Sequence, residues 1–90
     1  MEVNLTISPG VINLGETVTV TFTSTGAEDT QISADNLATP IDLGAGDQSG
    51  TFKFLPTVSG TFNVSIMGSL FYNGSGPVAN KQVSVSCQVN

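Results

Sequence analysis

The sequence has no histidine, no tryptophan, one cysteine and only two basic residues, Lys53 and Lys81. Catalytic cysteines need a neighbouring general base, usually histidine, so the missing histidine argues against this kind of enzyme. Nucleic-acid binding needs a basic surface that neutralises phosphates, and two lysines cannot supply one. Binding to an anionic membrane surface is excluded for the same reason. The formal net charge of −5 instead favours solubility.

Long apolar runs are also missing. No stretch approaches the roughly 20 apolar residues of a membrane helix, so we expect no membrane insertion. The first residues show neither the basic segment nor the apolar segment of a signal peptide. Ninety residues are enough for one domain, which we expect to span residues 1–90. Its apolar content of 39 % is sufficient for a core and too high for intrinsic disorder.

Apolar residues alternate with small polar residues in three runs, at 17–23, 60–66 and 82–89. Successive side chains of a strand point to opposite faces, so this alternation predicts strands with one buried face. No window shows the spacing of three and four residues that is typical of a helix. Shorter runs between turn residues predict further strands at 3–7 with a continuation at 11–14, at 31–34, at 36–43 and at 51–55.

Turn residues divide these strands. Pro40 cannot donate a hydrogen bond to a sheet, so the strand at 36–43 is expected at an edge. Residues 44–50 are expected to form a flexible loop, 56–60 a crossing between the sheets, and 73–77 the turn between the last two strands. Alternation is poorest at 31–43, which we therefore expect to be the least protected part of the fold.

The alternation also predicts which side chains form the core. Cys87 is in phase with its apolar neighbours in the last strand, which is typical of a buried thiol that acts as a small apolar residue. An intermolecular disulfide is the alternative use of a lone cysteine. The predicted core residues are Val3, Leu5, Ile7, Val18, Val20, Phe22, Ile32, Leu37, Phe52, Phe54, Phe62, Val64, Ile66, Val83, Val85 and Cys87.

Three segments resemble an immunoglobulin-like domain of the bacterial or phage surface type, with a weaker similarity to filamin repeats. They are Ser8-Pro9-Gly10-Val11 leading through Leu14-Gly15-Glu16 into the strand with Val18, Val20 and Phe22; the run from Phe54 to Val64; and the closing strand with Val83, Val85 and Cys87. The resemblance implies an all-β fold, an immunoglobulin-like Greek-key β-sandwich of about seven antiparallel strands in two sheets.

The sequence departs from antibody-type domains at their characteristic positions. Val20 and Val64 stand where the paired cysteines would be, and no tryptophan packs against them. Phe62 stands where a tyrosine hydroxyl would tie the corner. The resemblance is therefore to relatives that have no disulfide, and a fold alone says little about function.

Leu70, Phe71, Tyr72 and Asn73 form the candidate contact patch. They follow a strand and precede a glycine-rich turn, which would place an aromatic side chain at one end of the domain. The alternative is that two of them cap the core, with a bulge at Gly68 that changes the phase of the strand.

Seven carboxylates are scattered along the chain, several of them in predicted loops. Their spacing lacks the dense pattern of a calcium loop, so we interpret them as turn residues with side-chain-to-backbone bonds, with calcium binding as the alternative. Paired carboxylates could in principle hydrolyse glycosides, but the chain offers few aromatic side chains outside the core for such a cleft. We expect no catalytic residue, no cofactor and no metal ion.

These observations favour a non-enzymatic module: a decoration, adhesion or spacer domain on a virion surface or on an extracellular bacterial surface. Its partner would be a cell-surface glycan or protein, or a neighbouring subunit of a particle. The first alternative is an assembly domain that contacts subunits through an exposed strand edge. The second is an accessory carbohydrate-binding domain of a secreted enzyme.

Overall fold

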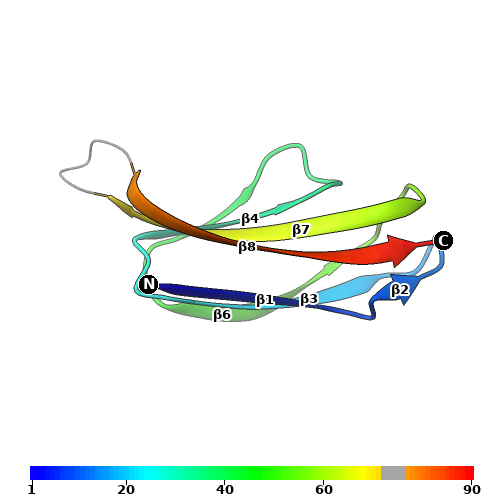
Figure 1. Cartoon of the computed structure of the whole chain (residues 1–90), viewed down its shortest axis with the longest axis horizontal. Helices are drawn as coiled ribbons and strands as arrows, with labels where there is room; N and C mark the ends of the chain where they lie inside the picture. Colours follow the sequence, from blue (N-terminus) through cyan, green and yellow to red (C-terminus); the bar gives the residue numbers. More distant parts are fainter. Residues whose placement is uncertain (72–76) are drawn as a thin grey trace.

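The computed structural model describes residues 1–71 and 77–90, and these residues form eight strands and no helix. No helix long and apolar enough to cross a membrane is found in this part of the chain. Figure 1 shows the strands in two layers. Their bounds are β1 Glu2–Ser8, β2 Val11–Ile12, β3 Val18–Thr25, β4 Asp29–Ala34, β5 Ile41–Gly44, β6 Gln48–Phe54, β7 Gly60–Phe71 and β8 Pro77–Val89.

One layer is a three-stranded sheet with the order β1-β3-β6, and the other is a five-stranded sheet with the order β2-β8-β7-β4-β5. The predicted all-β class and the two sheets are confirmed. The prediction of antiparallel pairing holds for every described pair except one, because β2 runs parallel to β8. After β1 the chain leaves the three-stranded sheet, and only two residues separate β1 from β2 at the edge of the other sheet. At this edge β2 runs in the same direction as β8.

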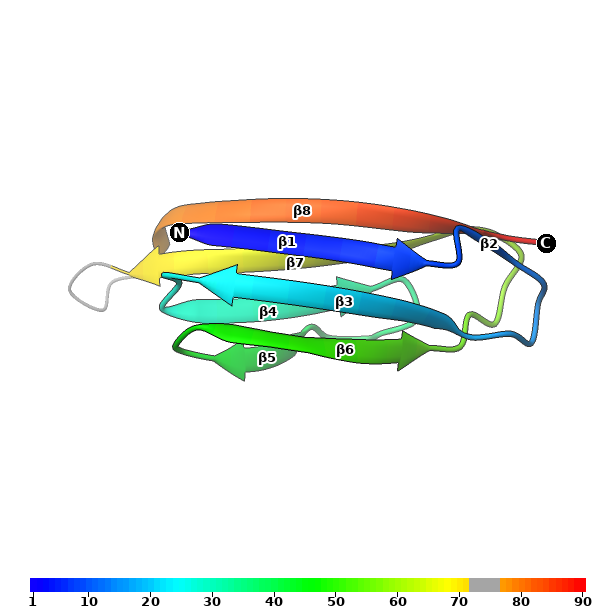
Figure 2. The ribbon, with the colours of Figure 1, turned by 90° about the horizontal axis from the view of Figure 1, so that it is seen from below.

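The molecule is elongated, with Cα extents of 46 × 21 × 15 Å. The strands of both sheets run along the long axis, and the two termini lie at opposite ends of it (Figures 1 and 2). β1 and β8, the first and last long strands, lie on the same side of the molecule in different sheets (Figure 2).

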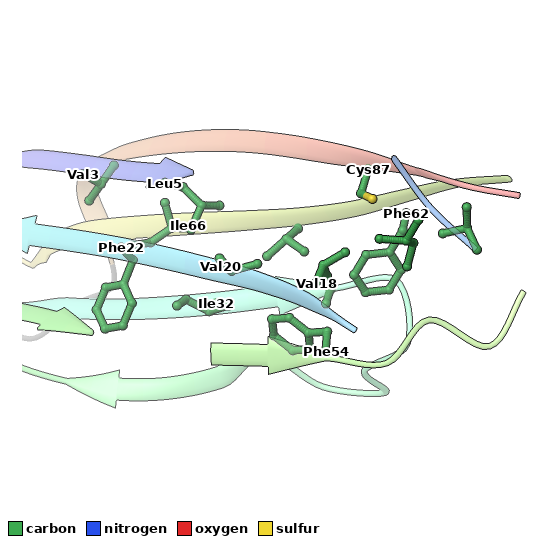
Figure 3. Close-up of a cluster of buried hydrophobic side chains, with 14 residues drawn as sticks. Val3, Leu5, Val18, Val20, Phe22, Ile32, Phe54, Phe62, Ile66 and Cys87 are labelled. Atoms are coloured by element: carbon green, nitrogen blue, oxygen red, sulfur yellow. The ribbon is translucent and has the colours of Figure 1, made fainter. Parts of the chain in front are cut away.

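The core lies between the two sheets (Figure 3). Most of the predicted core residues are buried, and the others are half-buried against the same cluster: Ile7, Leu37, Phe52, Val83 and Val85. The thiol of Cys87 is 1 % exposed, which confirms its predicted burial. The sequence pattern missed the buried apolar residues Ile12, Ala27, Ala34 and Val89, most of which lie at strand ends or in turns.

Four phenylalanines form a row through the core. The ring centroids of Phe22 and Phe52 are 5.7 Å apart, those of Phe52 and Phe54 are 6.2 Å apart, and those of Phe54 and Phe62 are 6.1 Å apart. These separations and tilts are within the range of favourable aromatic pairs. Because Phe62 belongs to the five-stranded sheet and the other three to the three-stranded sheet, the row joins the two layers.

Two predicted boundaries are wrong. The predicted loop at 44–50 is shorter, because β5 extends to Gly44 and β6 begins at Gln48. The Gln48 side chain donates to the carbonyl oxygen of Leu43 at 2.7 Å and to that of Gly44 at 3.2 Å, which closes the turn and brings the two strands together. The predicted strand at 36–43 is reduced to Ile41–Gly44, which begins directly after Pro40 and lies at the sheet edge, as predicted.

Candidate functional site

The predicted contact patch is only partly described. Leu70 and Phe71 end β7, and both side chains are half-buried. The backbone N–H of Phe71 donates to the Glu28 carboxylate at 3.2 Å, which ties the end of β7 to the turn before β4. Tyr72 and Asn73 lie outside the described residues. The contact patch therefore stays a prediction, of which Leu70 and Phe71 are located at the end of β7.

The predicted bulge is also displaced. The register between β7 and β8 is continuous through Gly68 and shifts only between Leu70 and Phe71. Gly68 has another role, since a Cβ atom placed there would lie 2.8 Å from Val3 Cγ1. Glycine at this position lets a side chain of β1 approach the backbone of β7 closely.

A different site is found at the other end of β7, where the end of β4 meets the crossing at 56–60. A hollow of about 250 Å³ adjoins a second one of about 160 Å³, and both include Asp35. The larger hollow is lined by Asp35, Asn36, Thr57, Val58, Ser59, Thr61 and Phe62. The smaller one is lined by Ser33, Ala34, Asp35, Asn63, Val64, Ser65 and Ser84. We call this pair of depressions the Asp35 hollow.

Asp35 is held in place by three hydrogen bonds with Asn63. The backbone N–H of Asn63 donates to Asp35 Oδ2 at 2.8 Å, and the Asn63 amide donates to the same oxygen at 3.0 Å. The backbone N–H of Asp35 donates in return to the Asn63 carbonyl oxygen at 3.0 Å. Within the described residues, the other carboxylate oxygen, Oδ1, accepts no hydrogen bond. The site thus presents a fixed carboxylate with one oxygen free to accept.

The larger depression of the Asp35 hollow is lined by both polar and apolar residues. Three hydroxyls come from Thr57, Ser59 and Thr61, while Phe62 is only 5 % exposed and Val58 is 75 % exposed. A carboxylate surrounded by hydroxyls can accept hydrogen bonds from the hydroxyl or amino groups of a ligand. The volume is below the 300–1,000 Å³ of typical small-molecule pockets, so the hollow suits one small polar group of a larger partner.

The outer faces of both sheets carry rows of small neutral side chains. Ser33, Ser65 and Ser84 are register neighbours on β4, β7 and β8 of the five-stranded sheet. On the three-stranded sheet, Thr6 lies opposite Thr21, which lies opposite Thr51 on β6. The serine row borders the Asp35 hollow and extends its hydroxyl-lined surface across three strands.

Loop carboxylates mostly accept hydrogen bonds from backbone groups, as predicted. Asp42 Oδ1 accepts from the Gly44 N–H at 2.9 Å, and Asp47 Oδ1 accepts from the Gly26 N–H at 2.8 Å. Within residues 1–71 and 77–90, no three histidine, cysteine, aspartate or glutamate side chains lie close enough to hold a metal ion.

Asp29 and Asp42 form a carboxylate pair between neighbouring strands. A hydrogen bond with Asp42, partial burial and charge repulsion raise the pKa of Asp29 above its ordinary value of 3.8. The same hydrogen bond, together with the one from the Gly44 N–H, lowers the pKa of Asp42. The pair is therefore best described as two carboxyl groups that share a proton in acid.

Sequence reasoning missed the Asp35 hollow because its parts are far apart in the chain. Asp35 and Asn36 follow β4, whereas Thr57, Ser59 and Asn63 lie more than twenty residues later. The one indication of this site in the sequence was the pair of turn-forming residues Asp35-Asn36, directly after an alternating strand. Only the pairing of β4 with β7 brings these groups together. No protein-family model, no curated protein and no solved structure matches this chain.

Proposed function

We propose that this chain is a non-enzymatic spacer and binding module with an immunoglobulin-like Greek-key fold. The observation that carries the proposal is the placement of the two termini at opposite ends of a body 46 Å long (Figure 1). A domain or subunit attached at one terminus would be held away from one attached at the other. The sheet orders β1-β3-β6 and β2-β8-β7-β4-β5 support the fold assignment, since immunoglobulin-like domains also divide their strands between two such sheets.

Backbone bonds near the C-terminus support the spacer role. The N–H of Gln88 donates to the Gly10 carbonyl oxygen, and the N–H of Asn90 donates to that of Ile12, both at 2.9 Å. The last strand is thereby fastened to a segment close to the start of the chain. These bonds hold the end of the module in the fold, which favours transmission of a fixed spacing rather than a flexible connection.

The Asp35 hollow is the contact site in this proposal. Its fixed carboxylate and the neighbouring hydroxyls favour a partner rich in hydroxyl groups, which is the chemistry of a cell-surface glycan. We place such a module on a virion or bacterial surface because of the resemblance found in the sequence. The lack of histidine and the burial of Cys87 support a non-enzymatic role.

The spacer role can be tested by electron spin resonance distance measurement with labels near the two ends, for example on Glu2→Cys and Gln88→Cys. Cys87 is buried and should remain unlabelled in the folded protein. We expect a narrow distance distribution, as for a rigid body. A broad distribution, like that of a flexible linker, would overturn the spacer role.

The contact site can be tested by glycan-array binding with two charge-matched variants. Asp35→Asn changes the carboxylate in the hollow, and Asp47→Asn makes the same charge change in the turn between β5 and β6. We expect at least a tenfold loss of glycan binding for Asp35→Asn and none for Asp47→Asn, since one charge-assisted hydrogen bond is worth about 1.5–3 kcal/mol. Equal binding by all three proteins, or no binding by any, would reject the hollow as a glycan site.

A further inference from the structure

One side of β8 has almost no strand partner. β8 pairs with β7 along its whole described length, but on its other side β2 covers only Gln88 and Val89. Figure 2 shows β8 at the rim of the molecule, where β2 reaches only its C-terminal end. The part of β8 that precedes Gln88 is therefore an open sheet edge.

The hydrogen bonds at the end of β8 identify which backbone groups face this edge. The N–H groups of Gln88 and Asn90 both point to the side of β2. Successive residues of an antiparallel strand direct their N–H and C=O groups to opposite sides. Backbone groups on the same side as Gln88 therefore belong to Asn80, Gln82, Ser84 and Ser86, and no described strand pairs with them.

The open segment has few of the features that normally prevent strand edges from pairing. Residues 80–86 contain no proline and one charged residue, Lys81, whose ammonium lies 3.4 Å from the Glu2 carboxylate of β1, and their register with β7 is free of bulges. The opposite edge of the same sheet is better protected, because β5 has only four residues and follows Pro40. The edge strands of the other sheet, β1 and β6, carry one charged residue each, Glu2 and Lys53.

Two apolar side chains on the open segment are incompletely covered. Val83 and Val85 point toward the core, yet both are only half-buried, unlike Cys87 in the same strand. An additional strand beside β8 would cover more of their surface and satisfy the free backbone groups.

We propose that this edge binds a second copy of the chain, with β8 antiparallel to β8 about a two-fold axis at Val83. In this register Asn80 pairs with Ser86 and Gln82 pairs with Ser84 of the other copy. Every free backbone group from Asn80 to Ser86 is used, and the ladder stops before Gln88, whose N–H is already bonded. The two five-stranded sheets would join into one continuous sheet.

The segment is complementary to itself, which favours a second copy over an unrelated strand. The neutral polar side chains face one another on the outer side, and Val83 lies opposite Val83 on the inner side. Lys81 lies opposite Val85, so the register places no like charges in opposite positions. A two-fold contact of this kind is the commonest form of self-association. A ladder of about seven residues buries little area, so we expect a weak dimer.

Cysteine cross-linking tests the register. Val83→Cys places two thiols opposite each other, at the separation of about 4.5–5.5 Å between Cβ atoms of facing residues. Val85→Cys is the matched control, because it lies opposite Lys81 and about four residues, or roughly 13 Å, from its own copy. We expect mild oxidation to give a covalent dimer at least tenfold more efficiently for Val83→Cys. Equal yields, or a higher yield for Val85→Cys, would overturn the proposal.

Sedimentation equilibrium of the unmodified chain tests whether the partner at the β8 edge is a second copy of the chain. Each copy carries a net charge of −5, so added salt should strengthen a self-association, whereas it would weaken a contact with a basic partner. Ser84→Lys, which adds a charge to the edge strand, should abolish the dimer, and Ser65→Lys on the neighbouring β7 should leave it in place. A strict monomer at millimolar concentration, or equal effects of the two variants, would contradict the proposal. The association is measured without glycan, so a failure of this proposal can be distinguished from a failure of the glycan site or of the spacer role.

Discussion

The hydroxyl oxygens of Ser24 and Thr30 lie 2.8 Å apart, and both side chains are completely buried. Ser24 belongs to β3 in one sheet and Thr30 to β4 in the other, so this hydrogen bond joins the two layers beside the turn that connects them. Each hydroxyl satisfies the other in the buried interior. A buried hydroxyl without a partner is costly, so neither residue can be replaced independently of the other.

Thr30→Val should lower the free energy of unfolding by about 1–3 kcal/mol, because it leaves the Ser24 hydroxyl buried and unpaired. Urea denaturation provides the measurement. Ser24→Ala combined with Thr30→Val removes both hydroxyls, and we expect the double variant to lose clearly less than the sum of the single losses. Additive losses would show that the two hydroxyls do not satisfy each other.

Gly68→Ala should destabilise the fold by about 1–3 kcal/mol through overpacking. The new methyl group would lie 2.8 Å from Val3 Cγ1 and 3.3 Å from Ala27 Cβ, and neither neighbour is a flexible side chain. Gly10→Ala is the control, since a Cβ atom there would have no neighbour within 4 Å. Thermal unfolding should separate the two variants, and Val3→Ala should partly rescue Gly68→Ala. A Gly68→Ala protein as stable as the control would contradict the close approach of β1 to β7.

Cys87 should be inert in the folded protein and reactive in the unfolded one. Its thiol is 1 % exposed and donates to the carbonyl oxygen of Gln88 at 3.6 Å. A colorimetric thiol reagent should therefore react at least a hundredfold faster in 6 M guanidinium chloride than in buffer. Cys87→Ser should cost about 1–3 kcal/mol, since it buries a more polar group. Fast labelling of the folded protein would instead favour a role for this thiol in intermolecular disulfides.

Stability in acid should depend on the Asp29–Asp42 pair. The raised pKa of Asp29 means that folding favours its protonated form. Its contribution to the stability of the fold is therefore complete below pH 3.8 and is lost as pH rises through the raised pKa. The lowered pKa of Asp42 has the opposite effect. Asp42 contributes to the stability of the fold above pH 3.8, and this contribution is lost as pH falls through the lowered pKa. The pair is therefore most stabilising near pH 3.8, where it holds one proton.

Asp42→Asn should make the unfolding free energy less dependent on pH on either side of the ordinary pKa of 3.8, because one of the two coupled carboxyls is removed. At pH 7 the variant should be at least as stable as the unmodified chain, since the repulsion between the Asp29 and Asp42 carboxylates is gone. Denaturation over a pH series provides the measurement, with Asp47→Asn as a control of equal charge. Identical pH profiles for the unmodified chain and Asp42→Asn would contradict the coupling.

Amide hydrogen exchange should divide the segment 31–43, which the sequence predicts to be the least protected part of the fold. β4 pairs with β7 on one side and β5 on the other, and Ile32 is completely buried, so residues 31–34 should exchange slowly. The backbone N–H groups of Asn36, Ala38 and Thr39 lie outside the strands and should exchange fast. Equally fast exchange over the whole segment would contradict the central position of β4.

The strands and their buried faces could largely be read from the sequence. The runs at 17–23 and 60–66 alternate, and alternation is a local property that fixes which side chains share a face. Strand ends were harder to predict. The Gln48 side chain closes the turn after β5 by donating to the backbone carbonyl oxygens of Leu43 and Gly44. Because every residue has a backbone carbonyl, the sequence does not indicate such a bond.

The candidate site shows the limit of local patterns. Leu70 and Phe71 were predicted as part of a contact patch because they follow a strand and precede a glycine-rich turn, and both are half-buried at the end of β7. The Asp35 hollow was overlooked, because its residues are individually ordinary turn and surface residues. What makes it a site is the register that sets Ala34 opposite Val64 and so brings Asp35 to Asn63.

The sequence by itself determined the all-β class, the inward-facing side chains of the main strands and the burial of Cys87. It also determined that the chain has no histidine and only two lysines. These properties depend on residue type and on spacing within one strand. Tertiary structure alone decided which strands are neighbours, and with them the Ser24–Thr30 contact, the Asp35 hollow and the open edge of β8. The Ser24–Thr30 contact and the Asp35 hollow join residues that are distant in the chain, and the open edge depends on which strand is left unpaired. Hydrogen-bonded pairing between strands decides all three features.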